Sequence, residues 1–156
     1  MSGRQAIKQE QERIHLCYSL NQNRMKQIKV TDHHTAESLS HFEFRKGDLV
    51  MGDTGYGTAQ DFIYAHEQEA DVILRITPGS FCLYDADGEK KSLVSLLKQA
   101  DEQGCLIMDI SGFCRYQNKT GFVRVIAEKL PEEQAREARK RKQNLLRKVN
   151  SFFAGF

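Results

Sequence analysis

Alternating and continuous apolar runs divide the first half of the chain into predicted strands and one clear helix. Four of these runs are expected to form a single mixed sheet, at residues 13–20, 25–31, 48–53 and 71–76. The turn-forming sequence Asn21-Gln22-Asn23 separates the first two runs, which predicts an antiparallel hairpin. Thr58 is a suitable N-cap for the helix predicted between the last two runs.

The second half of the chain reads as a β-rich section followed by a long helix. Its predicted elements are a strand at 81–84 that enters a turn at 85–88, a short helix around 93–97, and strands at 105–110 and 122–127. Pro131 fits the first turn of the final helix, and Glu132 and Glu133 lie where the helix dipole favours anions. Leu145, Val149 and Phe152 extend its apolar face.

Together these patterns predict an α/β protein in four parts. They are a polar lead-in at 1–12, a sheet-and-helix core at 13–79, a β-rich insertion at 80–127, and a basic amphipathic helix with the C-terminus at 128–156. No apolar run approaches the roughly 18 residues that a membrane span needs, and the N-terminus lacks the hydrophobic segment of a signal peptide. We therefore expect a cytoplasmic protein that does not bind membranes.

Positive charge is concentrated in the predicted final helix. The formal net charge is only +2, yet residues 129–148 contain eight basic and three acidic residues. The densest group, Arg139, Lys140, Arg141 and Lys142, is a candidate for binding the phosphates of DNA. The alternative is that these side chains form a solvated charged face with no partner.

A glycine-rich turn after the strand at 48–53 carries the main candidate for chemistry. Asp53 follows the apolar residues of that strand and lies among Gly52, Gly55 and Gly57, which predicts an exposed carboxylate in a turn whose conformations a Cβ would forbid. Such a carboxylate is a suitable ligand for magnesium or manganese. The alternative is that Asp53 merely ends a strand. The sequence Asp32-His33-His34 matches no zinc motif and is expected to form a polar turn.

Several short motifs, in this order, resemble the insertion-sequence-4 family of DDE transposases. They are Arg13-Ile14-His15-Leu16, Glu37-Ser38-Leu39, the segment from Gly47 to Gly57, Ile73-Leu74-Arg75, and Leu83-Tyr84-Asp85-Ala86-Asp87-Gly88. The continuation from Ala127 to Arg136 and the basic group at 139–142 also look like the family's basic segment. The resemblance covers roughly residues 13 to 148.

The resemblance implies an RNase H-like core interrupted by a β-rich insertion. It also implies DNA cleavage and joining by two magnesium or manganese ions held by Asp, Asp and Glu, with Asp53 as the second of these acids. Residues 1–12 contain no aspartate for the first position, and the chain stops at Phe156 without the family's downstream signature that carries the glutamate. We therefore expect a transposase-derived chain that is inactive alone.

Two alternatives to an inactive transposase fragment stay open. The chain could act as a non-catalytic regulator that binds DNA or an intact transposase, or it could be a domain without a retained function. An unpaired edge on the strand at 13–20, where the family places a further strand, would favour self-association.

Overall fold

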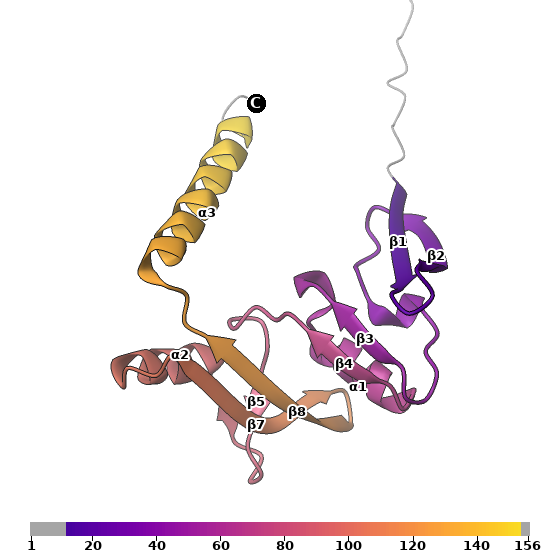
Figure 1. The fold of residues 1–156 in the computed structure, drawn as a ribbon, viewed down its shortest axis with the longest axis horizontal. Coiled ribbons are helices and arrows are strands. Elements are labelled where there is room, and N and C mark those ends of the chain that lie inside the picture. The colour runs from indigo at the N-terminus through magenta and orange to yellow at the C-terminus, as the bar shows by residue number, and fades with distance from the viewer. Residues whose placement is uncertain (1–11, 154–156) are drawn as a thin grey trace, which may run out of the picture. The chain divides into compact units, whose positions relative to one another are not determined.

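The computed structural model describes the backbone of residues 12–153 and the side chains of residues 12–144, and the predicted α/β class is confirmed (Figure 1). The lead-in at 1–12, apart from Glu12, and the side chains of Leu145, Val149 and Phe152 lie outside the described residues. The chain divides into two compact units. The first extends to residue 96 and includes 111–124, and the second comprises 97–110 and the chain from 125 onward.

The predicted N-terminal hairpin is confirmed. Strands β1 (Glu12–Ser19) and β2 (Arg24–Asp32) pair antiparallel, with a bulge between Cys17 and Tyr18. Asn23 takes a positive φ of 48° in the connecting turn, a conformation that asparagine tolerates better than most residues. The turn signal in the sequence was therefore sufficient to place the hairpin.

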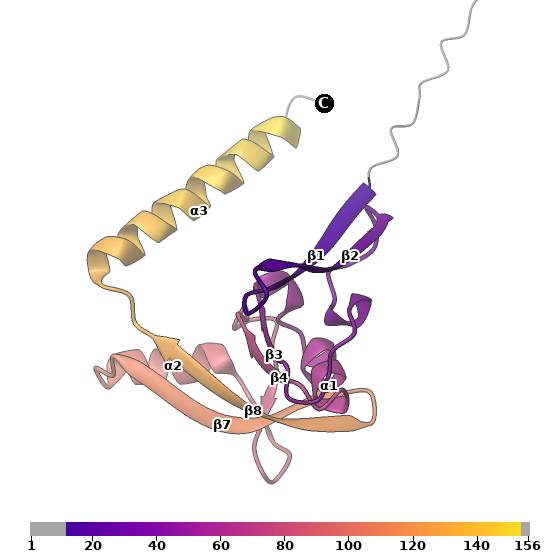
Figure 2. The same cartoon turned by 45° about the vertical axis from the view of Figure 1, so that its right-hand side comes forward.

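The next elements form a βαβ unit. Strand β3 (Leu49–Gly52) leads through α1 (Ala59–Glu67) to β4 (Asp71–Leu74), and the two strands pair in parallel. Thr58 is the N-cap of α1, as predicted, and its hydroxyl accepts a hydrogen bond from the Asp61 backbone N–H. Helix α1 lies beside β4 (Figure 2). Together with the segment 39–44, the unit encloses a core of Leu39, Phe42, Phe44, Ala65 and Ala70.

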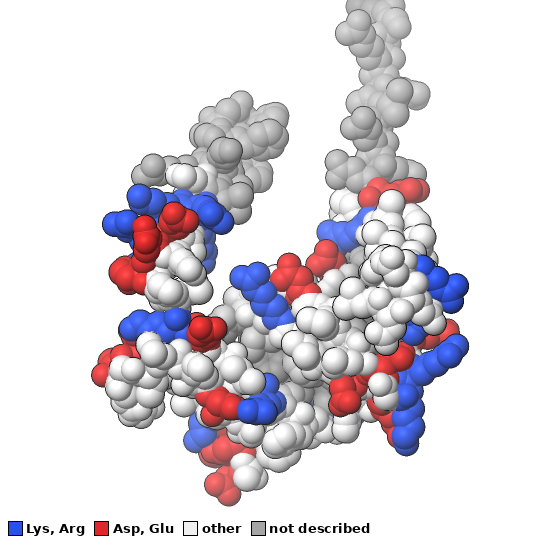
Figure 3. All heavy atoms as spheres, viewed as in Figure 1, with Lys and Arg blue, Asp and Glu red and all other residues white. Residues whose placement is uncertain are grey.

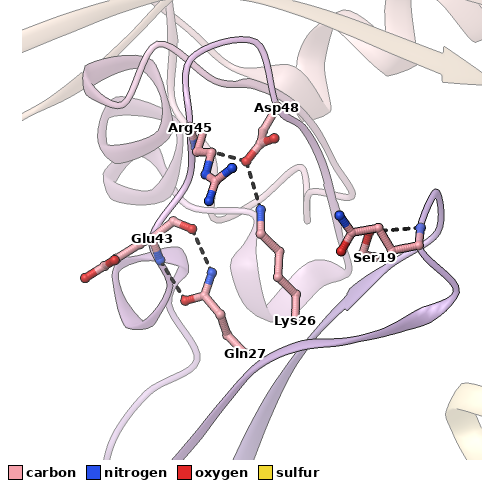
Figure 4. Close-up of polar contacts among 7 residues, drawn as sticks. Ser19, Lys26, Gln27, Glu43, Arg45 and Asp48 are labelled. Atoms are coloured by element: carbon pink, nitrogen blue, oxygen red, sulfur yellow. Dashed lines mark hydrogen bonds and ion pairs between the residues drawn. The ribbon is translucent and has the colours of Figure 1, made fainter.

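The prediction of one mixed sheet is wrong. The hairpin and the β3–β4 pair are separate two-stranded sheets, because side chains rather than a backbone ladder connect them. Gln27 on β2 binds the backbone of Glu43 through both ends of its amide, at 2.7 Å to the carbonyl oxygen and 3.0 Å from the N–H (Figure 4). Lys26 donates to the Asp48 carboxylate at 3.1 Å, just before β3 begins (Figure 4).

The β-rich section forms a further sheet with the strand order β6-β5-β7-β8. Its strands are β5 (Leu83–Tyr84), β6 (Lys90–Lys91), β7 (Ile107–Tyr116) and β8 (Lys119–Glu128). The predicted turn between β5 and β6 is confirmed: Asp85 accepts hydrogen bonds from the backbone N–H groups of Asp87 and Glu89, and Gly88 has a φ of 83°. The helices α2 (Leu93–Glu102) and α3 (Glu132–Phe153) also occur where predicted, although α2 is longer than expected.

Candidate functional site

Asp53 lies at the edge where the two parallel strands of the βαβ unit end. It follows β3, Arg75 follows β4, and the Arg75 N–H donates to the Gly52 carbonyl at 3.1 Å. Asp53 Oδ1 is 3.9 Å from Arg75 Nη1, and both side chains are more than three-quarters exposed. The predicted exposed carboxylate is therefore confirmed. An ion pair this open to water contributes little to stability.

The turn after Asp53 is held by its own backbone. Asp53 Oδ1 accepts from the Thr54 N–H at 2.7 Å, and its carbonyl oxygen accepts from the Tyr56 N–H at 2.9 Å. This closes the short 3-10 helix η2 (Thr54–Tyr56). One Asp53 oxygen, Oδ1, is thus already engaged by the turn.

The glycines of this turn serve a purpose different from the one predicted. None of Gly52, Gly55 and Gly57 has a positive φ. A Cβ at Gly55 would instead overlap the Glu37 carboxylate, and a Cβ at Gly57 would overlap the carbonyl oxygen of Arg75. At Gly57, where the obstacle is backbone, close packing rather than an unusual dihedral angle therefore requires glycine.

Carboxylates near Asp53 do not form a metal site among the residues that the structure describes. No group of three His, Cys, Asp or Glu side chains there is arranged to hold an ion. Glu37 lies against Gly55, two residues from Asp53. The Asp48 carboxylate is already hydrogen-bonded, because it accepts from the Arg45 N–H and from Lys26. These hydrogen bonds lower the pKa of the Asp48 carboxyl. Asp32 forms the expected polar turn by accepting from the His34 and Thr35 N–H groups.

Asp61 is a buried residue that the sequence reasoning missed. Its side chain is 1% exposed. It accepts from the Leu39 N–H at 2.7 Å, from the Ser38 hydroxyl at 2.9 Å and from the Thr58 hydroxyl at 2.6 Å. The sequence did carry a signal, since Thr58 and Asp61 have the spacing of a capping box with aspartate in place of glutamate. Asp61 joins the N-terminus of α1 to the segment that supplies much of the core.

His15 is the other buried polar residue that was missed. It is 2% exposed, its Nε2 lies 2.9 Å from the Thr31 hydroxyl, and its ring centroid is 4.5 Å from that of His41. Burial lowers the pKa of His15, and the neighbouring His41 and Arg13 lower it further. A neutral His15 therefore fits this place, where it helps to attach the hairpin to the segment containing His41.

The candidate DNA-binding residues lie on the described part of α3. Among its described side chains, from Glu132 to Asn144, only Ala135 is partly buried and the others are exposed. Arg139 pairs with Glu132 at 2.5 Å and Arg141 pairs with Glu137 at 3.6 Å. Figure 3 shows blue basic and red acidic side chains next to one another on the described part of α3. Part of the positive charge is therefore offset locally.

Comparisons with protein-family models, with curated proteins and with solved structures found no match to this chain. Among the described residues, no helix combines the length and the apolar character that a bilayer crossing requires.

Proposed function

We propose that this is a transposase-derived protein that binds the phosphate backbone of DNA through α3 and does not cleave DNA on its own. The observation that carries the proposal is that the basic side chains on the described part of α3 are all exposed. Cationic side chains on an exposed helix release counterions from DNA without first breaking a tertiary contact. The sequence resemblance is the basis for three further parts of the proposal. They are an RNase H-like ancestry, a parent reaction that uses magnesium or manganese, and transposon ends as the DNA partner.

Helical geometry decides which cations can reach one duplex. Successive residues are about 100° apart around a helix, so the four residues at 139–142 point in nearly all directions. Arg136 and Lys140 are four positions apart and share a face, and Arg139 lies at its margin. Arg141 points away from that face. We therefore expect three phosphate contacts, from Arg136, Arg139 and Lys140.

Binding to duplex DNA is expected to be independent of sequence and steeply dependent on salt. Three phosphate contacts predict a slope of about −2.7 for the logarithm of the association constant against the logarithm of salt concentration. The double variant Arg136→Ala/Lys140→Ala should reduce the steepness of this slope by about 1.8. Fluorescence anisotropy with unrelated duplexes of equal length, measured over a series of salt concentrations, gives both quantities.

The matched control removes the same charge from another part of the helix. Arg141→Ala/Lys142→Ala also loses two cations, yet the slope should change less than in the first variant. Glu132→Gln should strengthen binding, because it releases Arg139 from its ion pair. Equal slopes for the two double variants would show that net charge alone, and not one face of α3, determines binding. An absence of binding at low salt would contradict the proposal and show that the charged side chains of α3 only contact solvent.

Strand cleavage is expected to be absent in magnesium or manganese. By the sequence resemblance Asp53 is the second of the three family acids, no group of metal-binding side chains surrounds it among the described residues, and one exposed carboxylate binds a dication weakly. Supercoiled plasmid incubated with the purified chain should show no nicking above background. Nicking that disappears in Asp53→Ala would contradict the proposal, whereas nicking that survives this substitution would indicate a contaminating nuclease.

A further inference from the structure

The β1–β2 hairpin carries its apolar residues on the side that faces away from the core of its unit. We call this surface the outer face. On β1, Ile14, Leu16 and Tyr18 are 63%, 52% and 49% exposed. On β2, Met25, Ile28 and Val30 are 41%, 63% and 52% exposed. The strand register places Ile14 opposite Val30, Leu16 opposite Ile28 and Tyr18 opposite Met25, so the six side chains form one continuous patch.

The opposite, inner face of the hairpin makes mostly polar contacts. His15 meets Thr31 and His41, Arg13 donates to the Thr35 carbonyl oxygen at 2.8 Å, and Gln27 binds the Glu43 backbone. Cys17 is the apolar contact from this face to the core. The alternation along both strands is therefore the reverse of an ordinary half-buried sheet, whose apolar side faces the core. This reversal leaves an apolar face without a packing partner among the described residues.

We propose that a second copy of this chain covers the outer face, so that two hairpins pack face to face in a twofold-symmetric dimer. A patch of six large, roughly half-exposed side chains offers on the order of 500 Å² per copy, or on the order of 1,000 Å² in total. This is the lower limit for a specific interface and implies a weak dimer. The patch is also as large as the largest apolar patches of ordinary monomers, which often have a function.

Charge at the two ends of the hairpin selects the orientation. Glu12 and Asp32 are paired in register at the open end, on the same side as Ile14 and Val30, and Arg24 lies at the turn end opposite Ser19, at the margin of the inner face. With the twofold axis perpendicular to the strands, the acidic end of each copy lies over the turn end of the other. With the axis parallel to the strands, acid would face acid. The first arrangement avoids this repulsion at both symmetry-related ends and brings each acidic end near the turn end that carries Arg24, so we expect it to be favoured.

The oligomeric state of the full chain tests this inference. Sedimentation equilibrium from low to high micromolar concentration should show a reversible monomer–dimer equilibrium. Leu16→Glu should raise the dissociation constant at least about a hundredfold, because each dimer would bury two unpaired charges at its centre. Met51→Glu is the matched control: Met51 is 66% exposed on β3, outside the outer face, so this variant should dimerise like the parent chain.

A charge-exchange series keeps the test independent of any folding defect in Leu16→Glu. Arg24→Glu and Glu12→Arg should each weaken the dimer about tenfold, and the double variant should recover most of that loss. A chain that stays monomeric at every concentration overturns the proposal. Residues 1–11 or a different protein would then be the candidates for covering the outer face. A dimer that survives Leu16→Glu also overturns it, and pairing through the open edge of β1 would then be the better account.

Discussion

Replacing Asp61 with alanine is expected to lower the free energy of unfolding by about 3 kcal/mol, since the buried partners of a carboxylate lose their acceptor. The Leu39 N–H and the Ser38 and Thr58 hydroxyls all donate to this side chain. Alanine restores none of these hydrogen bonds and admits little water to a position that is 1% exposed. Urea unfolding followed by circular dichroism measures the change.

Two further variants separate the role of Asp61 from a general sensitivity to losing an aspartate. Asp61→Asn keeps one acceptor oxygen in nearly the same volume, so its loss should be smaller than that of alanine. Asp53→Ala removes an exposed carboxylate and should cost about 0.5 kcal/mol or less. If Asp61→Ala and Asp53→Ala destabilise the chain equally, Asp61 does not join α1 to the segment at 38–44.

Local elements of the fold could be predicted because their signals are local. The Asn21-Gln22-Asn23 turn places the first hairpin, Thr58 places the start of α1, and Asp85 with Gly88 places the turn between β5 and β6. The lengths of α2, β7 and β8 were underestimated. Tertiary and cross-strand contacts extend an element beyond its most apolar run.

The association of the strands could not be predicted from the same patterns. Period-2 alternation shows that the two faces of a strand differ, but it does not show which face is turned to the core. On β1 and β2 the polar face is turned inward, because Gln27, His15 and Arg13 find specific partners in the segment 35–43. Contacts between a side chain and a distant backbone leave no periodic trace in a sequence.

The candidate site was predicted in position but not in detail. The exposed place of Asp53 follows from a short apolar strand ending in a polar turn, and this needs no tertiary information. The buried Asp61 and His15 were missed because polar residues are expected at the surface. The glycines were recognised, but a sequence cannot distinguish a glycine needed for its φ from one needed for close packing.

Gly57→Ala is expected to destabilise the chain by about 2–4 kcal/mol, because a Cβ there would overlap the backbone of the segment that follows β4. The first obstacle is the Arg75 carbonyl oxygen, which the Cβ would overlap. The second is the Ile76 Cα, which would lie 3.1 Å from the Cβ. Neither can move aside as a flexible side chain can. The φ of Gly57 is −81°, so the loss would come from packing and not from dihedral strain.

Gly79→Ala provides the matched control for Gly57→Ala. No atom lies within 4 Å of a Cβ built on Gly79, and its φ is not positive. Alanine there should leave stability unchanged or raise it by about 0.5 kcal/mol, since it restricts the unfolded chain. Urea unfolding of both variants gives the comparison. A Gly57→Ala chain as stable as Gly79→Ala would show that the turn after Asp53 is free to move away from β4, and Asp53 would then have no fixed place beside Arg75.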